Sequence, residues 1–106
     1  MAQFSEHTRE DGTCVIEASG EVDLAVVDEL LEIARGGLSA APALCVDLRD
    51  VTFIDSTGLG ALVLIRNEAR DAGRPMRVIN VPRAVHRLLT LTGLEDAFDV
   101  DSTDGA

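Results

Sequence analysis

Apolar and polar residues alternate along the chain in two rhythms, which predict strands separated by helices. Residues 3–9 and 13–19 have the two-residue period of strands, and an Asp-Gly pair between them predicts a hairpin turn. Apolar runs at 43–48 and 76–81 have the length and composition of buried strands. Strands that alternate with helices favour a largely parallel sheet, and the opening hairpin makes the sheet mixed.

Two helices are predicted between these strands. The first has Asp23 as its N-cap, runs to about Arg35 and ends at Gly36. Its apolar residues recur near helical spacing: Leu24, Val27, Leu30, Leu31 and Ala34. The second begins around Ser56–Gly58 and ends at Gly73.

The last part of the chain predicts a third helix after Pro82, which suits a first helical turn. Residues 92–100 hold a turn and a final short strand or helix, and the polar tail 101–106 is expected to be frayed. The order is β-β-α-β-α-β-α-(β). It predicts one α/β domain over residues 1–106, with helices packed against a mixed sheet of four to five strands.

The charge of the chain limits its classes of partner. The formal net charge is −10 at pH 7, and all nine basic residues are arginine. So acidic a chain is unsuited to nucleic acid or to an anionic membrane surface, and we expect neither as a partner. It favours a partner with a basic face. The absence of lysine excludes Schiff-base catalysis and the lysine of a phosphate-binding P-loop.

The cysteines and the hydrophobic profile bear on location. Cys14 and Cys45 lie in apolar runs without metal-binding spacing, which predicts buried free thiols. The chain opens on a polar segment without a signal peptide, and no uncharged run approaches the ~20 residues of a membrane span. We therefore expect a cytoplasmic protein that is a monomer or a weak dimer.

The most informative segment is VTFIDSTGLGAL, residues 51–62, in which a strand-like run ends at Asp55 and two hydroxyls follow. Its hydroxyls can serve as a nucleophile, as part of a phosphate cradle, as a helix cap, or as a site that another protein modifies. The G-x-S-x-G pattern of a nucleophile elbow is absent. His7 lies in a terminal strand and His86 on a helix of core positions, so no catalytic residue is predicted. The His/Cys spacing of a metal site is also absent, and we expect neither metal nor cofactor.

Two aspartates in this region, Asp47 and Asp55, suggest two further functions. Asp47 follows an apolar run, as the phospho-accepting aspartate of a receiver domain does, but that chemistry needs a lysine that the chain lacks. Asp55 or Ser56 can cap the helix by accepting a hydrogen bond from a free backbone N–H. A phosphate on Ser56 would add roughly −1.5 to −2 charges at the positive helix end. A partner that accommodates a neutral hydroxyl would then meet repulsion.

The helix after the turn is apolar almost all the way round from Leu59 to Ile65. One face must pack on the sheet, and the opposite face is either buried by other elements or exposed for docking. Gly58 and Gly60 each cost about 1 kcal/mol in a helix, and they would let the backbone of a partner approach. This cost favours a docking surface beside the hydroxyl of Ser56.

These residues resemble those of a known family. VDLRDVTFIDSTGLGALV, residues 46–63, is similar to the signature segment of STAS domains, in particular of single-domain bacterial anti-sigma factor antagonists. GEVD at 20–23 resembles the family's Gly-Glu-hydrophobic-Asp turn, and VPRAVHRLLTLTGL at 81–94 resembles its Pro-led helix. The resemblance covers about residues 12–98. It implies the STAS fold, a mixed sheet with helices against it.

The resemblance also implies a partner-switching regulator of transcription that is not itself an enzyme. In the family, an anti-sigma factor that is also a serine kinase phosphorylates the serine after the aspartate, here Ser56, and a serine phosphatase resets it. The unphosphorylated form binds the kinase and frees the sigma factor. Thr57 is the less favoured acceptor. The residues expected to bind the partner are Asp23, Asp55, Ser56, Thr57, Gly58, Leu59, Gly60 and Val63.

Two other functions stay open on the sequence. One is a STAS scaffold without a phosphorylation cycle, such as a stressosome-like component or a subunit of a transport complex. The other is an enzyme that uses Ser56 as a nucleophile. Oligomerisation or co-purification with transporter subunits favours the first, and labelling of Ser56 by a serine-directed probe favours the second.

Overall fold

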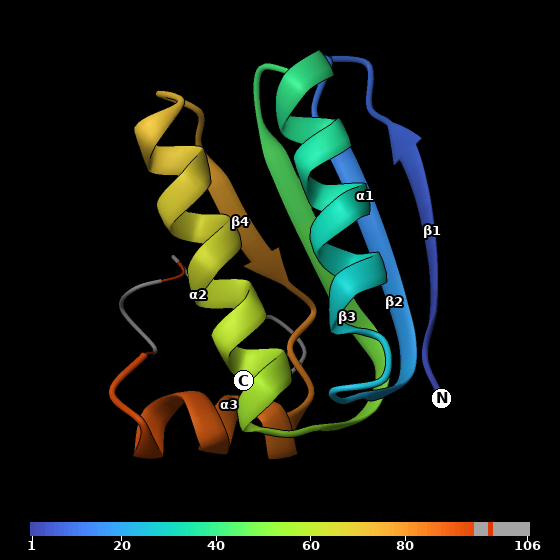
Figure 1. The fold of residues 1–106 in the computed structure, drawn as a ribbon, viewed down its shortest axis with the longest axis vertical. Coiled ribbons are helices and arrows are strands. Elements are labelled where there is room, and N and C mark those ends of the chain that lie inside the picture. The colour runs from blue at the N-terminus through green and yellow to red at the C-terminus, as the bar shows by residue number, and fades with distance from the viewer. Residues whose placement is uncertain (95–97, 99–106) are drawn as a thin grey trace.

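The computed structural model describes residues 1–94 and residue 98, which contain one four-stranded sheet and three helices (Figure 1). In chain order these elements are β1 (Gln3–Thr8), β2 (Cys14–Val22), α1 (Val27–Ala40), β3 (Leu44–Ile54), α2 (Ser56–Asp71), β4 (Met76–Ile79) and α3 (Arg83–Leu91). The strands lie side by side in the order β1-β2-β3-β4. Only the β1–β2 pair is antiparallel. The mixed α/β sheet is thus confirmed, whereas most of the last expected element, within 92–100, and the tail 101–106 lie outside the described residues.

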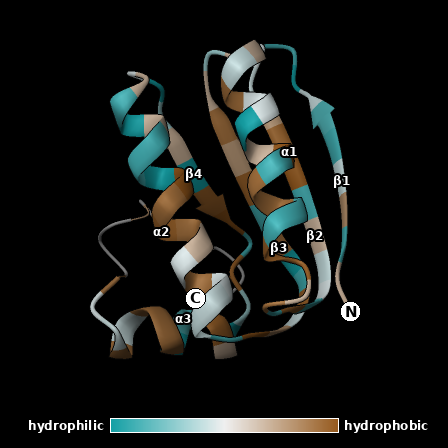
Figure 2. Ribbon diagram, in the orientation of Figure 1, coloured by the Kyte–Doolittle hydropathy of each residue, from teal (hydrophilic) through white to brown (hydrophobic). Residues whose placement is uncertain are grey.

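Helices α1 and α2 cover one face of the sheet, and α3 lies across the end at which β3 finishes (Figure 1). Alternate residues of β2, namely Cys14, Ile16 and Ala18, join the core that lies under the helices. The edge strand β1 is mainly hydrophilic, and the central strands are more hydrophobic (Figure 2). A polar edge strand is one way in which proteins avoid pairing with other chains.

The first helix starts and ends later than the sequence predicts. Asp23 is not its N-cap, because α1 begins at Val27 and its cap position is Val26. Gly36 does not end it either, because the helix continues to Ala40. Neither Gly36 nor Gly37 has the positive φ of a helix-ending glycine. A Cβ on Gly37 would lie 2.9 Å from Cys14 Sγ, so close contact with β2 accounts for a glycine inside the helix. Leu24 falls outside the helix and is 74% exposed.

The two central strands are longer than the apolar runs that predict them. β2 continues through the GEV segment to Val22, and β3 runs through to Ile54. Register shifts between Glu17 and Ser19 and between Gly20 and Glu21 interrupt the regular pairing of β2 with β3. Gly20 has φ +83°, and a Cβ there would lie 2.5 Å from the carbonyl oxygen of Met1, so only glycine fits.

Several other predictions of local structure are confirmed, although β4 ends at Ile79, two residues before the predicted strand end at residue 81. Helix α2 begins at Ser56 and ends before Gly73, and α3 follows Pro82 with Val85 and Leu89 buried. Cys14 and Cys45 are both buried free thiols. They flank opposite faces of the sheet, because Cys45 is the register partner of Val15, the residue after Cys14.

Candidate functional site

The turn that joins β3 to α2 is held by Asp55. Its side chain caps the helix, since Oδ1 accepts hydrogen bonds from the Gly58 backbone N–H at 3.0 Å and from the Thr57 hydroxyl at 2.5 Å. The Asp55 N–H donates to the Val22 carbonyl at 3.2 Å, which joins the turn to the end of β2. Between Asp55 and Ser56, which were equal candidates for the cap on sequence, the structure selects Asp55.

These contacts set the charge of the Asp55 carboxyl. The Thr57 hydroxyl, and then the Gly58 N–H, hold its pKa below the ordinary value. Because the folded pKa lies below the unfolded one, this carboxylate stabilises the fold at neutral pH. That contribution is lost as the pH falls through the folded pKa. The turn therefore carries a full negative charge beside Ser56 at neutral pH.

The Thr57→Val substitution tests this account of the charge. Removing the hydroxyl donor is expected to raise the pKa of Asp55 towards its ordinary value, as read from a carboxyl-carbon NMR titration. Asp11 is the internal control, because its low pKa depends on Thr13. An unchanged Asp55 titration in the variant would contradict the assignment of Thr57 as the main donor.

Ser56 and Thr57 are not equivalent in the structure. Ser56 occupies the first position of α2 and is exposed, and its side chain makes no hydrogen bond to another residue in the described part of the chain. Thr57 is half-buried, and its hydroxyl donates to Asp55. The free hydroxyl at the positive end of the helix is therefore that of Ser56.

Gly58 and Gly60 also differ, although the sequence gives them one role. Gly58 is buried, and a Cβ there would lie 2.7 Å from Ile54 Cγ1 and 2.8 Å from the Val22 carbonyl oxygen. It permits α2 to approach the ends of β2 and β3, and not the approach of a partner. Gly60 is exposed, and an added Cβ would meet nothing within 4 Å. Leu59, 6% exposed, belongs to the core.

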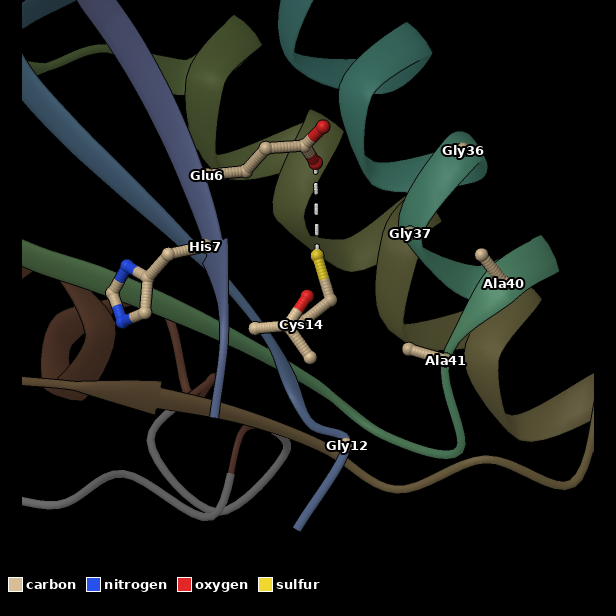
Figure 3. Close-up of a pocket in the computed structure, with 9 residues that line it drawn as sticks. Glu6, His7, Gly12, Cys14, Gly36, Gly37, Ala40 and Ala41 are labelled. Atoms are coloured by element: carbon tan, nitrogen blue, oxygen red, sulfur yellow. Dashed lines mark hydrogen bonds between the residues drawn. The ribbon is translucent and has the colours of Figure 1, made fainter. Parts of the chain in front are cut away.

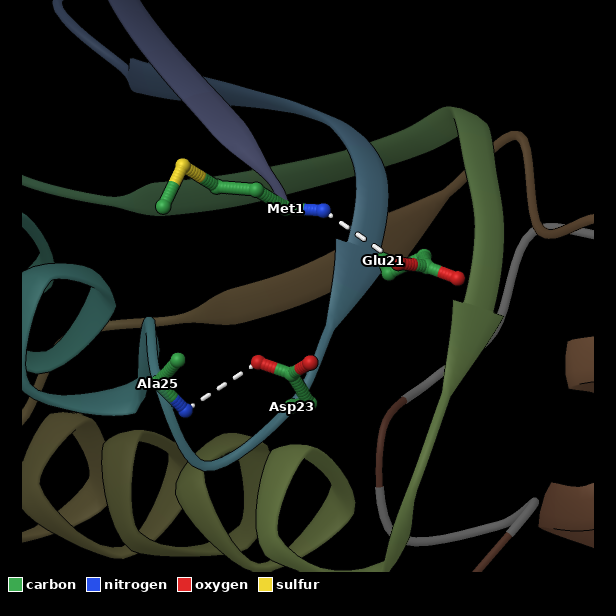
Figure 4. Close-up of polar contacts among 4 residues, drawn as sticks. All are labelled: Met1, Glu21, Asp23 and Ala25. Carbon is green, nitrogen blue, oxygen red and sulfur yellow. Dashed lines mark hydrogen bonds and ion pairs between the residues drawn. The ribbon is translucent and has the colours of Figure 1, made fainter.

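Asp23 lies beside this turn, because Val22 and Ile54 are register partners and the two aspartates follow them directly. The Asp23 carboxylate accepts a hydrogen bond from the Ala25 N–H at 3.1 Å, which shapes the loop before α1 (Figure 4). Figure 4 also shows the ion pair of the Met1 amine with Glu21, 3.2 Å apart, at the end of β2. The carboxylates of Asp23 and Asp55 thus follow the ends of two neighbouring strands.

Three exposed hydrophobic side chains lie near the turn, and the sequence analysis anticipates an exposed apolar face only on α2, which carries Leu64. Leu24 is 74% exposed, Phe53 51% and Leu64 40%. Leu64 continues the line of Ser56 and Gly60 along α2 at intervals of four residues, and Val63 beside it is half-buried. The two-residue period of a strand could have indicated that Phe53 is exposed, because Ile54, the next residue, occupies a buried position. Together these residues give the acidic turn an apolar margin.

A separate hollow of about 440 Å³ lies at the other end of β2, between β1 and the C-terminal half of α1 (Figure 3). Cys14 and Glu6 form part of its wall, and the Cys14 thiol donates to Glu6 Oε2 at 3.7 Å. Burial, and then the Glu6 charge, raise the pKa of this thiol, so it is protonated at neutral pH and a weak nucleophile. Because this thiol lies at the other end of β2, we assign it no role at Ser56.

Within residues 1–94 and 98, no three His, Cys, Asp or Glu side chains gather as metal ligands would. No helix in the same residues is long and apolar enough to cross a membrane.

Comparison with known proteins places the chain in a family. The family model described as "Mlab, STAS domain" matches residues 5–100. The chain belongs to the STAS domain family. An anti-sigma-B factor antagonist of Bacillus subtilis (strain 168) is similar to this STAS domain, with 29% identity over 91 residues, 82% of this chain and 80% of that protein.

Solved structures agree with this STAS fold. A crystal structure of an anti-sigma factor antagonist from Mycobacterium paratuberculosis has a TM-score of 0.86 and 26% identity, covering 97% of this chain and 87% of that one. Unphosphorylated SpoIIAA, also an anti-sigma factor antagonist, has a TM-score of 0.79 at 18% identity, covering 97% of this chain and 91% of that one. At 18% identity, the match to SpoIIAA shows that the two folds are similar and nothing further.

Proposed function

We propose that this STAS domain is an anti-sigma factor antagonist whose binding is switched off by phosphorylation of Ser56. The observation that carries the proposal is the exposed Ser56 hydroxyl at the start of α2, beside neighbours that are already engaged. The relatives reported above support the antagonist function. The partner is an anti-sigma factor with serine kinase activity, and a serine phosphatase reverses the modification.

The charge of the turn supplies the mechanism of the switch. In the unphosphorylated form, the partner contacts a surface that includes Asp23, Asp55, Ser56 and Gly60, with Leu64 at its margin. A phosphate on Ser56 adds roughly −1.5 to −2 charges next to the ionised Asp55. The free N–H groups and the positive end of α2 stabilise this phosphate, so the fold tolerates it. The partner, in contrast, must desolvate a doubly charged group beside a carboxylate, and it dissociates.

Incubation with the cognate kinase and ATP tests the site of modification. Mass spectrometry is expected to find one phosphate on Ser56, and none after the Ser56→Ala substitution. Because the Ser56 side chain makes no hydrogen bond to the other described residues, Ser56→Ala is expected to keep the melting temperature of the parent chain. A phosphate on Thr57, or no phosphate with a kinase that binds the chain, would overturn the proposal.

A STAS scaffold without a phosphorylation cycle is the second candidate, and the family description "Mlab, STAS domain" is the observation that favours it. Its surface would be the same turn, but binding would not depend on the charge at Ser56. Binding that is equal for Ser56→Ala and Ser56→Glu therefore distinguishes the scaffold from the switch.

A further inference from the structure

Three arginines line one hollow at the C-terminal end of α2, the end of the helix farthest from Ser56. The hollow measures about 410 Å³, and Arg66, Arg70 and Arg74 line it together with Gly73, Pro75 and Met76. This is unexpected in a chain of net charge −10. Four of the nine arginines lie within residues 66–77, against two acidic residues, Glu68 and Asp71.

The guanidinium groups of the hollow are held by neutral acceptors. Arg66 Nη1 and Arg70 Nη2 both donate to Asn67 Oδ1, at 3.2 and 3.4 Å. Arg74 Nη1 donates to the Ala41 carbonyl. Within residues 1–94 and 98, none of these three arginines forms an ion pair with a carboxylate.

One of the two acids within residues 66–77, Glu68, is already engaged elsewhere. Both carboxylate oxygens of Glu68 accept from Arg35 on α1, at 2.9 and 2.8 Å. This bidentate pair also lowers the pKa of Glu68. Arg35 therefore neutralises the charge of Glu68. The guanidinium groups of the three arginines at the hollow keep several N–H donors that are not used in hydrogen bonds with the other described residues.

Helix electrostatics account for part of this arrangement. Arg70 lies in the last turn of α2, where a cation interacts favourably with the negative end of the helix dipole. The dipole effect falls off within one turn, so it does not account for Arg66. It also does not account for the apolar wall that Pro75 and Met76 add to the same hollow. The combination of guanidinium forks and an apolar wall suits a ligand that is both anionic and partly apolar.

We propose that this basic hollow binds an extended acidic segment of a partner protein. Arg66 and Arg70 are four residues apart on α2, which corresponds to a rise of about 6 Å along the helix. Alternate side chains of an extended peptide are about 6.5 Å apart, so carboxylates at every second position match the arginines. The intervening side chains face Pro75 and Met76. The net charge of −10 disfavours a nucleic acid at the same place, because a long polyanion also meets the rest of the acidic surface.

A pair of synthetic peptides tests the proposal on the full chain. The probe is a capped heptapeptide that alternates Asp with Val, and the control replaces each Asp by Asn. We expect the Asp peptide to shift the side-chain Nε–Hε NMR signals of Arg66, Arg70 and Arg74, and not that of Arg87 on α3. Equal shifts with the Asn peptide, or shifts spread evenly over all nine arginines, would overturn the proposal.

Matched variants separate the hollow from the net charge. Arg66→Gln and Arg70→Gln are each expected to weaken binding of the Asp peptide between about three- and tenfold. Arg87→Gln removes the same charge from an exposed position and is expected to leave binding unchanged. An equal loss in Arg87→Gln would contradict a defined site. Tighter binding of an oligothymidylate than of the Asp peptide to these arginines would also contradict the proposal.

The test is independent of the proposed switch. Ser56 lies ten residues before Arg66 on α2, a distance of about 15 Å along the helix. That exceeds the Debye length of about 10 Å at 0.1 M salt, so Ser56→Glu is expected to leave peptide binding unchanged. Failure of the peptide to bind would remove the acidic partner segment and would leave the proposal for Ser56 intact.

Discussion

Gly58→Ala is expected to lower the free energy of unfolding by about 1–3 kcal/mol. The new methyl group would lie 2.7 Å from Ile54 Cγ1 and 2.8 Å from the Val22 carbonyl oxygen. The side chain of Ile54 can turn away, but the carbonyl belongs to the backbone of β2, so the start of α2 must move. Urea-induced unfolding followed by circular dichroism measures the loss.

Gly60→Ala is the matched control, two residues further along the same helix. An added Cβ there meets nothing within 4 Å, so alanine is expected to raise the free energy of unfolding by about 0.5–1 kcal/mol through helix propensity. A stabilised Gly60→Ala variant that binds its partner more weakly would place Gly60 in the docking surface. Equal stabilities for the two variants would contradict the close approach at Gly58.

Ser56→Glu is expected to weaken binding to the cognate anti-sigma factor by about tenfold or more, equivalent to about 1.4 kcal/mol. Ser56→Ala is expected to bind as tightly as the parent chain. Glutamate carries one charge, whereas phosphoserine carries roughly −1.5 to −2, so the phosphorylated protein should bind more weakly still. Isothermal titration calorimetry with the purified partner compares the three proteins.

Ser39→Glu is the control for this series. Ser39 is exposed on α1, and the substitution adds the same charge away from the turn at Asp55. It is expected to leave partner binding unchanged. If Ser39→Glu weakens binding as much as Ser56→Glu does, total charge and not the position of the phosphate governs the interaction, and the switch at α2 is wrong.

Sequence periodicity predicts the kind and order of the elements because each element repeats one local pattern. It fails at the ends of α1, where long-range contacts decide. Gly36 and Asp23 carry the usual signals of a helix end and a helix start. In the structure, close packing on Cys14 accounts for the glycine at position 37 inside the helix, and the Asp23 carboxylate accepts a hydrogen bond in the turn before the helix.

The position of the candidate site could be predicted, but the division of labour within it could not. A strand followed by Asp-Ser-Thr-Gly indicates a capped helix start, and the resemblance to STAS domains singles out Ser56. Which side chain caps, and which glycine is buried, depend on Val22, a residue of another strand. The exposure of Leu24 likewise depends on where α1 begins.

The contact of Asp55 with Val22 has a consequence for the timing of signalling. The two residues are separated along the chain by all of α1 and β3, and β2 and β3 pair in parallel. Parallel pairing of distant segments forms only after a long loop has closed, which makes it a slow event in folding. The turn that presents Ser56 is therefore completed after the core strands have met. A partner that binds at this turn would require β2 and β3 to be paired, so it would distinguish folded chains from chains in which this pairing is lost.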